Sequence, residues 1–286
     1  MARPEISVVT VTHGRLPVLL DKAEALRRQT LEPASFEWIV VANGDPAGAA
    51  ALRSAELPFP TDIVESDTNL PIGAARNLAA ARASAPVLLM SDDDCLPNPE
   101  ALAGHLRAHR ETGGEAVVVA PLRLPDALRV GAQREPFERS FHLGRRALWI
   151  NATGANTSLP RPAFEAVGGY DESFVDYGGE DPDLALRLRR RGARFRYEPT
   201  AWAYHVGRVL GQDPERAYLA GRAHRRIFDR DPSLEVGVLL GVHPWLLAAK
   251  RWLLSGPARR LLPDEVRVYE RAYLEGASGW AEGAER

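Results

Sequence analysis

The chain has 286 residues, 45% of them hydrophobic, and a formal net charge of −2 at pH 7. This length and apolar content suffice for one large domain or two small ones. The balanced charge argues against nucleic acid as a partner, because nucleic-acid-binding domains usually carry a marked basic excess. A single cysteine, Cys95, excludes an intrachain disulfide. Because the N-terminus has no apolar stretch of signal-peptide length, we expect a cytoplasmic protein.

Strand and helix patterns alternate along the first hundred residues. Short apolar, β-branched runs predict strands, and the segments between them predict helices. This alternation predicts right-handed βαβ units, and hence an α/β fold with a mostly parallel, Rossmann-like sheet flanked by helices. Ligands of such sheets bind at the carboxyl ends of the strands. The predicted strands are 6–12, 36–42, 61–66 and 87–90, and the predicted helices are 16–28, 47–55 and 73–83.

The strand predicted at 87–90 leads directly into three aspartates, Asp92, Asp93 and Asp94. Strand geometry would place Asp92 and Asp94 on one side and Asp93 on the other. Two carboxylates at one sheet edge repel each other unless a cation lies beside them, and hard oxygen ligands suit Mg²⁺ or Mn²⁺. Asp, Asn and Pro are also ordinary turn residues. These residues alone therefore predict either a divalent-metal site or a solvated acidic turn.

Polar residues also follow the other predicted strands, at Thr12, Arg15, Asn43 and Asn69. The turn after the first strand, THGRLP, lacks the G-x-G-x-x-G fingerprint of dinucleotide-binding folds, and the sequence contains no P-loop. Arg76 falls in the first turn of the third predicted helix, whose N-terminus would attract a phosphate. An exposed helix arginine is an equally good interpretation of Arg76.

Several sequence blocks resemble the family 2 inverting glycosyltransferases with the GT-A fold. The blocks are SVVTVTHGR, VVANG, NLPIGAARN and MSDDDCLP, followed by residues 154–205, and they occur in the family's order. The resemblance implies a GT-A domain that uses a divalent metal, Mn²⁺ or Mg²⁺, to move a sugar from a nucleoside-diphosphate sugar to an acceptor hydroxyl. The implied acceptor is a glycan, a lipid-linked molecule or a small molecule, as in polysaccharide biosynthesis.

The resemblance also implies roles for individual residues. Asp92-x-Asp94 matches the D-x-D element, with Asp94 on the metal and Asp92 on the ribose or the metal. His205 matches the histidine that often completes the metal site. Asp181 matches the general base, and Glu180 is the next candidate. The residues expected to contact the nucleotide sugar are Thr12, Arg15, Asn43, Asn69, Arg76, Asp92 and Asp93.

Asp181 has a second interpretation, and Ala42 departs from the family's pattern. Asp181 is followed by Pro182 and an apolar helical pattern, so it is also predicted to be a helix N-cap with proline at the first helical position. The two roles are compatible, because a helix N-terminus favours the ionised carboxylate that a base requires. Ala42 stands where the family usually has an aspartate that reads the nucleotide base. The sequence therefore does not select the base of the donor.

We expect a GT-A domain over 1–207, with a nucleotide-binding half of about 1–121 and an acceptor-binding half of about 122–207, and a helical extension over 208–286. The helices expected in the extension are 214–230, 234–255 and 263–280. The middle one is apolar but interrupted by His243-Pro244 and charged at Lys250-Arg251. It is therefore predicted to pack on the domain or to contact the inner face of the membrane peripherally, rather than to span the membrane. The oligomeric state is not predicted.

Two other functions are compatible with parts of this pattern. A nucleotidyltransferase shares the nucleotide and metal chemistry, but it would need a glycine-rich, triphosphate-gripping loop where this chain has THGRLP. A non-catalytic GT-A scaffold that binds sugars is favoured by Ala42 and disfavoured by the presence of Asp92, Asp94, Asp181 and His205.

Overall fold

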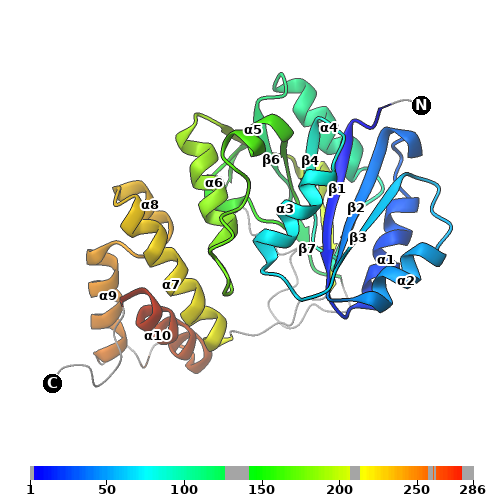
Figure 1. Ribbon diagram of the computed structural model, residues 1–286. Coiled ribbons are helices and arrows are strands. Elements are labelled where there is room, and N and C mark those ends of the chain that lie inside the picture. The colour runs from blue at the N-terminus through cyan, green and yellow to red at the C-terminus, as the bar shows by residue number, and fades with distance from the viewer. Residues whose placement is uncertain (1–2, 126–141, 207–212, 257–259, 261, 279–286) are drawn as a thin grey trace. The chain divides into compact units, whose positions relative to one another are not determined.

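The computed structural model describes residues 3–125, 142–206, 213–256, 260 and 262–278 (Figure 1). The chain divides into two compact units, Met1–Glu172 with Leu184–Arg208, and Ser173–Asp183 with Val209–Arg286. The second unit therefore includes a short segment, 173–183, that the predicted boundary at residue 207 assigned to the acceptor-binding half.

A nine-stranded sheet lies at the centre of the first unit. Four of its strands, in the order β3-β2-β1-β4, are parallel to one another. All eight residues of β2 are buried, as expected for a parallel strand covered on both faces. Helices α1 and α2 pack together on one face, and α3 packs against β1 and β2 on the other (Figure 1). The elements are β1 (Ile6–Thr12), α1 (Leu16–Arg27), β2 (Phe36–Asn43), α2 (Pro46–Ser54), β3 (Thr61–Ser66), α3 (Ile72–Arg82) and β4 (Val87–Met90). These strands and helices confirm the predicted alternation, with ends that differ by at most one residue.

The other half of the sheet is mixed. Strand β10 runs antiparallel to both β4 and β6, and β11 runs parallel to β6. The predicted α/β fold is confirmed, with parallel pairing concentrated in the first ninety residues. The elements are α4 (Ala101–Glu111), β6 (Ala116–Val119), β8 (His142–Leu143), β9 (Arg146–Ala147), β10 (Thr157–Pro160), α5 (Arg161–Ala166), α6 (Glu180–Arg190) and β11 (Arg194–Tyr197), with 3₁₀ helices at Pro33–Ser35, Trp149–Asn151 and Pro199–Ala201.

A separate three-stranded sheet joins distant parts of the first unit. It consists of β5 (Cys95–Pro97), β12 (Ala203–His205) and β7 (Leu122–Arg123), with β12 in the middle. Strand β5 pairs antiparallel with β12, and Cys95 lies opposite His205. This pairing brings His205 next to the aspartates that follow β4. Residues 126–141 of the predicted acceptor-binding half lie outside the described residues.

Two buried histidines of α4 share a hydroxyl of β10. His105 Nδ1 and His109 Nε2 lie 2.8 and 2.9 Å from Ser158 Oγ. His105 Nε2 lies 3.1 Å from Asn156 Oδ1. Burial lowers the pKa of His105 to about 4 and that of His109 to about 3. Both side chains are therefore neutral parts of the core at physiological pH.

We expect the free energy of unfolding to fall as the pH drops below about 6.5. Unfolded histidines bind protons below that pH, whereas the buried pair stays neutral until about pH 4 and pH 3, so the unfolded state binds more protons. At pH 5 each of the two histidines should have lowered the free energy of unfolding by about 2 kcal/mol relative to neutral pH. Urea denaturation at pH 7.5 and pH 5.0 measures this loss, and His109→Phe should remove about half of the pair's share. Equal stability at the two pH values would contradict the expectation.

The second unit is largely helical. Its helices are α7 (Pro214–Arg230), α8 (Leu234–Leu239), α9 (Pro244–Ser255) and α10 (Asp264–Ser278). The predicted helix 214–230 is confirmed at both ends, whereas the predicted helix 234–255 is two helices. The break falls where Gly241 takes a φ of +73° and Pro244 begins the next helix.

No helix among the described residues is both long enough and apolar enough to cross a bilayer. Helix α9 exposes Trp245 and Trp252, at 53% and 72% of their surface. Tryptophan is a side chain typical of membrane interfaces. Peripheral membrane contact through the C-terminal helices stays a prediction.

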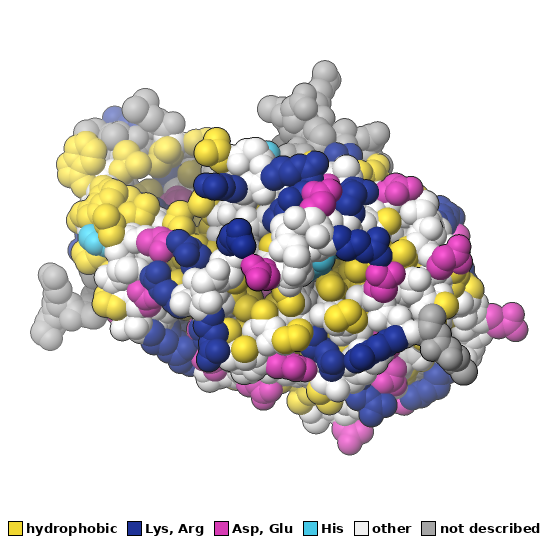
Figure 2. Space-filling model, turned by 90° about the horizontal axis from the view of Figure 1, so that it is seen from above, with side chains coloured by type: hydrophobic (Ala, Val, Ile, Leu, Met, Phe, Trp, Pro, Cys, Tyr) yellow, Lys and Arg dark blue, Asp and Glu magenta, His cyan; other side chains and the backbone are white. Residues whose placement is uncertain are grey.

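Charge is well mixed on the face drawn in Figure 2. Lys and Arg side chains alternate there with Asp and Glu instead of forming one continuous basic field. A nucleic-acid track needs such a field to replace the counterions of the phosphates. The absence of a nucleic-acid partner stays a prediction from the net charge of −2.

Candidate active site

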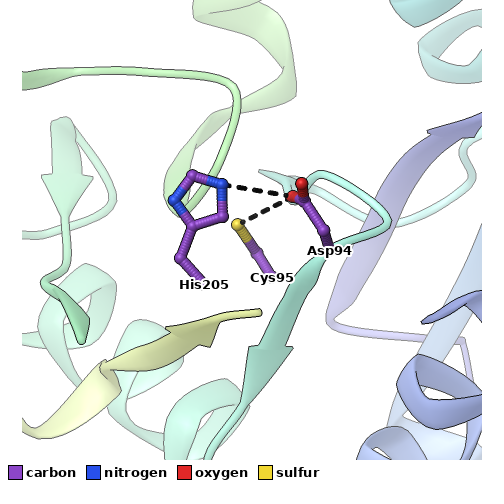
Figure 3. Close-up of side chains that lie close together, drawn as sticks. All are labelled: Asp94, Cys95 and His205. Carbon is purple, nitrogen blue, oxygen red and sulfur yellow. Dashed lines mark hydrogen bonds and ion pairs between the residues drawn. The ribbon is translucent and has the colours of Figure 1, made fainter. Parts of the chain in front are cut away.

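Three side chains that could ligate a cation meet where the small sheet begins (Figure 3). One potential ligand atom from each of Asp94, Cys95 and His205 lies within 4.8 Å of the others. His205 Nε2 is 3.4 Å from Asp94 Oδ1, and the Cys95 thiol donates to that same oxygen at 3.6 Å. Residues 94 and 95 follow β4, and His205 ends β12, so the cluster depends on the β5–β12 pairing.

The protonation of this cluster favours carboxylate and imidazole as ligands. Burial alone would raise the pKa of Asp94, but its hydrogen bond to His205 and the charge of Arg15 lower it to about 2. Burial raises the pKa of the Cys95 thiol well above its ordinary value, and the nearby aspartates add to this effect. A protonated thiol is a poor metal ligand. Asp94 and His205 thus fit Mn²⁺ or Mg²⁺, and Cys95 fills the space behind them.

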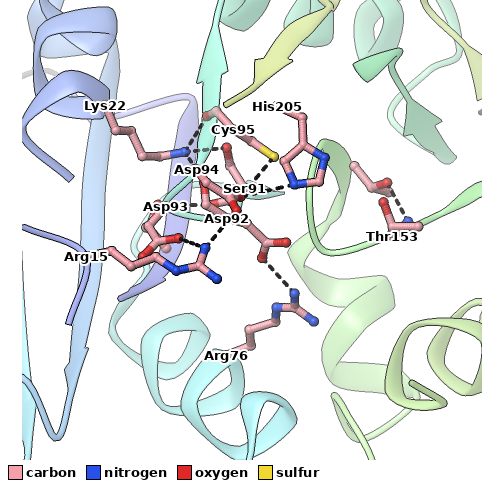
Figure 4. A network of polar contacts seen from close by, with 12 residues as sticks. Arg15, Lys22, Arg76, Ser91, Asp92, Asp93, Asp94, Cys95, Thr153 and His205 are labelled. Atoms are coloured by element: carbon pink, nitrogen blue, oxygen red, sulfur yellow. Dashed lines mark hydrogen bonds and ion pairs between the residues drawn. The ribbon is translucent and has the colours of Figure 1, made fainter. Parts of the chain in front are cut away.

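The aspartates themselves lie in a turn (Figure 4). Strand β4 ends at Met90, so strand geometry does not continue through them. Asp93 and Asp94 contact the same Arg15 guanidinium, at 3.2 and 2.7 Å, while Asp92 pairs separately. The predicted division of Asp92 and Asp94 from Asp93 is therefore wrong. Burial raises the pKa of Asp93, and the Asp94 carboxylate raises it further against the opposing effect of Arg15.

Arg76 of α3 is the partner of Asp92, at 2.8 Å (Figure 4). Its guanidinium lies 5.3 Å from the centre of the Tyr170 ring. A Cβ added to Gly154 would lie 2.1 Å from the guanidinium carbon, so a glycine is required there for the close approach. Only 5% of Arg76 is exposed, which overturns the interpretation of an exposed helix arginine. A buried, fixed guanidinium beside the aspartate turn suits an anionic ligand.

Lys22 of α1 supports the turn from behind, and the sequence analysis missed it. The side chain is fully buried, and its Nζ donates to Ser91 Oγ at 2.7 Å and to the carbonyls of Asp92 at 2.7 Å and Cys95 at 2.9 Å. These bonds use all three of its donors. Burial lowers the pKa of Lys22. The sequence pattern does indicate that Lys22 is buried, because it falls at helical spacing between the core residues Leu19 and Leu26.

The remaining predicted nucleotide ligands lie at the carboxyl ends of β1 and β2. Thr12 is 1% exposed, and its hydroxyl lies near enough to Asp93 to lower the pKa of that carboxyl against the effect of burial. The side-chain Nδ2 of Asn43 donates to Asn69 Oδ1 at 2.8 Å and to the Leu70 carbonyl at 2.9 Å. The side-chain Oδ1 of Asn43 accepts from the Leu70 backbone amide at 2.8 Å. The amide of Asn43 therefore braces the loop that carries Asn69.

Glu180 and Asp181 belong to the second unit, whereas the residues around Asp94 belong to the first. Helix α6 begins at Glu180, and its first backbone bond runs from the Asp183 amide to the Gly179 carbonyl at 2.9 Å. Asp181 therefore lies inside the first turn, and the prediction that it is the N-cap is wrong. Its carboxylate still benefits from the positive end of the helix dipole. Glu180 is 8% exposed.

Comparison with known families gives two matches. The family described as "Glycosyl transferase family 2" matches residues 7–163, and the one described as "N-terminal domain of galactosyltransferase" matches residues 137–208. The first match contains the aspartate turn, and the second contains Asp181 and His205.

Curated relatives carry related names. A "Validoxylamine A glucosyltransferase" of Streptomyces hygroscopicus subsp. limoneus is 30% identical over 230 residues, covering 70% of this chain and 51% of the relative. A "Pre-mycofactocin glycosyltransferase" of Mycobacterium tuberculosis is 27% identical over 217 residues, covering 71% of this chain and 45% of the relative. The chain thus spans about half the length of these curated relatives.

Two solved structures share the fold. The mannosyltransferase PcManGT from Pyrobaculum calidifontis, in complex with GDP-Man and Mn²⁺, superposes with a TM-score of 0.67 at 20% identity, covering 98% of this chain and 87% of that one. S. aureus TarS 1–349, in complex with UDP-GlcNAc, gives a TM-score of 0.62 at 14% identity, covering 97% of this chain and 93% of that one. These likenesses confirm the predicted GT-A fold.

Proposed function

The chain belongs to glycosyl transferase family 2, and from this premise we propose that it is a metal-dependent, inverting glycosyltransferase that uses a nucleoside-diphosphate sugar. The observation that carries the proposal is the pairing of Asp94 with His205 at 3.4 Å, beside two arginines. Family membership favours this activity over the nucleotidyltransferase alternative. The acceptor is proposed to be the hydroxyl of a glycan, a lipid-linked molecule or a small molecule.

At the donor end, Asp94 and His205, with Asp92 nearby, would hold Mn²⁺ or Mg²⁺. A bound cation would offset the negative charge that develops on the leaving diphosphate. Arg15 is suited to the same diphosphate, because its side chain is 49% exposed and a cation on Asp94 would replace its present ion pair. Arg76 adds a second, fixed guanidinium. Thr12, Asn69 and Asp93 complete the proposed nucleotide-sugar contacts.

At the acceptor end, Asp181 is proposed to remove the proton of the attacking hydroxyl, with Glu180 as the alternative base. A single displacement, in which the hydroxyl attacks from the face opposite the leaving diphosphate, inverts the anomeric carbon and needs one such base. The first turn of α6 supports this role, because a helix N-terminus keeps a carboxylate ionised.

The proposed function is tested by the release of nucleoside diphosphate. We expect release from a nucleotide sugar in the presence of Mn²⁺ and a suitable acceptor, and no release when the metal is chelated. A non-catalytic sugar-binding scaffold would bind the nucleotide sugar without releasing the diphosphate under any acceptor condition, and that result would overturn the proposal.

We expect the protein to discriminate weakly among the nucleobases of the donor, or to prefer a nucleobase other than uracil. Ala42 is 1% exposed and carries no acid, and the neighbouring Asn43 amide is already used by the loop at Asn69. A thermal-shift panel of UDP, GDP and dTDP, each with Mn²⁺, measures the preference. Exclusive stabilisation by UDP would show that another residue, such as Asp45, reads the base.

A further inference from the structure

We infer that helix α7 positions the segment that carries Glu180 and Asp181, and that Arg226 is the side chain that holds it. The inference rests on the proposed function, in which Asp181 is the general base. Segment 173–183 and the C-terminal helices form one compact unit, although thirty residues separate the end of the segment from the start of α7 at Pro214. Contacts between the segment and α7 explain this grouping.

Arg226 hydrogen-bonds to the first residue of the segment and stacks on the second. Its Nη1 donates to the Ser173 carbonyl at 2.9 Å, and its Nη2 donates to the Ser173 hydroxyl. The guanidinium carbon lies 4.4 Å from the centre of the Phe174 ring, which is 4% exposed. A guanidinium that stacks on a buried ring while its edge donates to a backbone carbonyl has a fixed position and orientation.

Arg230 lies one helical turn further on and contacts the same segment. Its guanidinium carbon is 5.7 Å from the centre of the Phe174 ring, and its Nη1 is 3.5 Å from Asp183 Oδ1. Residues four apart share one face of a helix. A single face of α7 therefore contacts both ends of the segment, before and after Glu180 and Asp181.

The backbone just before Glu180 also packs closely against α7. Gly179 has a φ of +140°, and a Cβ added to it would lie 2.6 Å from Phe174 Cδ1 and 2.7 Å from Ala223 Cβ. No side chain fits there without displacing the segment. Because the Gly179 carbonyl accepts the first backbone bond of α6, the position of α7 fixes where that helix begins.

The consequence for catalysis follows from geometry. A general base must lie within hydrogen-bond reach of its hydroxyl, and a displacement of about 1 Å can cost about 100-fold in rate. Arg226→Gln removes the stacking and the paired donation to Ser173. We expect it to lower kcat at least about tenfold while the affinity for nucleoside diphosphate with Mn²⁺ stays unchanged, because the proposed donor residues belong to the first unit.

Arg225→Gln is the matched control. Arg225 is the next residue of the same helix, and it pairs at 2.8 Å with Asp229, one turn later in α7. This exposed i,i+4 pair contributes little to stability. The control removes the same charge from the same helix and should leave kcat within about twofold of the wild type.

Hydrogen exchange of the full chain, followed at the amides of 176–183, tests the inference independently of turnover. We expect at least about tenfold faster exchange in Arg226→Gln than in the wild type or Arg225→Gln, together with the fall in kcat. Unchanged exchange would overturn the inference, and so would faster exchange with normal kcat. If the wild type transferred no sugar, the proposed function would fail, while the exchange result would still decide whether α7 holds the segment.

Discussion

Asp94→Ala is expected to abolish Mn²⁺-dependent binding of nucleoside diphosphate while the protein stays folded. Asp94 is the carboxylate that lies beside His205. Its hydrogen bonds to His205 and Arg15 outweigh the effect of burial and lower its pKa to about 2. Loss of a residue behind a metal ligand typically costs about 10- to 100-fold in affinity, so loss of a direct ligand should cost more. Calorimetric titration with UDP or GDP, with and without Mn²⁺, measures the effect.

The fold should tolerate this change, because Asp94 lies in a turn and Arg15 keeps its contact with Asp93 at 3.2 Å. Asp62→Asn is the control, since Asp62 pairs only with Arg82 among the ion pairs of the described residues, at 2.8 Å on the surface of β3 and α3. It should bind nucleotide like the wild type. Metal-dependent binding of undiminished strength in Asp94→Ala would remove Asp94 from the metal site.

Asp181→Asn is expected to lower kcat by about 10²- to 10⁴-fold and to leave donor affinity unchanged. The base acts on the acceptor hydroxyl and takes no part in holding the diphosphate. Because α6 begins at Glu180, Asp181 is not the capping residue, so the substitution removes no N-cap and weakens the interaction of one charge with the helix dipole. That interaction is worth about 0.3–1 kcal/mol, too little to unfold the segment.

Steady-state kinetics with a transferable acceptor, paired with calorimetry on the donor, separates the two quantities. Asp176→Asn serves as the control, because Asp176 is an exposed carboxylate of the same segment whose side chain is 58% accessible. It should keep normal turnover. If Asp181→Asn also transferred sugar at a near-normal rate, the base would lie elsewhere, and Glu180→Gln would be the next variant.

Local patterns predicted the parallel part of the fold well. Strands β1, β3 and β4 have the predicted ends, because each is a short apolar or β-branched run between turn residues. The small second sheet could not be predicted in the same way. Cys95–Pro97 has the composition of a turn, and it becomes a strand through pairing with Ala203–His205, more than a hundred residues later.

The site shows the same division between local and distant causes. The sequence located the aspartates correctly, directly after β4. It did not predict which arginine each aspartate contacts, because the chain turns there instead of continuing as a strand, so that Asp94 pairs with Arg15 and Asp92 with Arg76. The burial of Arg76 depends on Gly154 and Tyr170, which lie far from it in sequence. Gly179 combines both causes, because its φ of +140° favours glycine locally and Ala223 of α7 leaves no room for a Cβ.

The pairing of β5 with β12 also sets the order in which a newly made chain acquires its parts. The four parallel strands lie within the first ninety residues and can leave the ribosome together, N-terminus first. His205 is synthesised 111 positions after Asp94, so a growing chain contains the aspartates long before it contains the histidine. During synthesis the aspartate turn therefore exists for more than a hundred residues without its imidazole. The cations available to it in that interval are Lys22, Arg15 and Arg76.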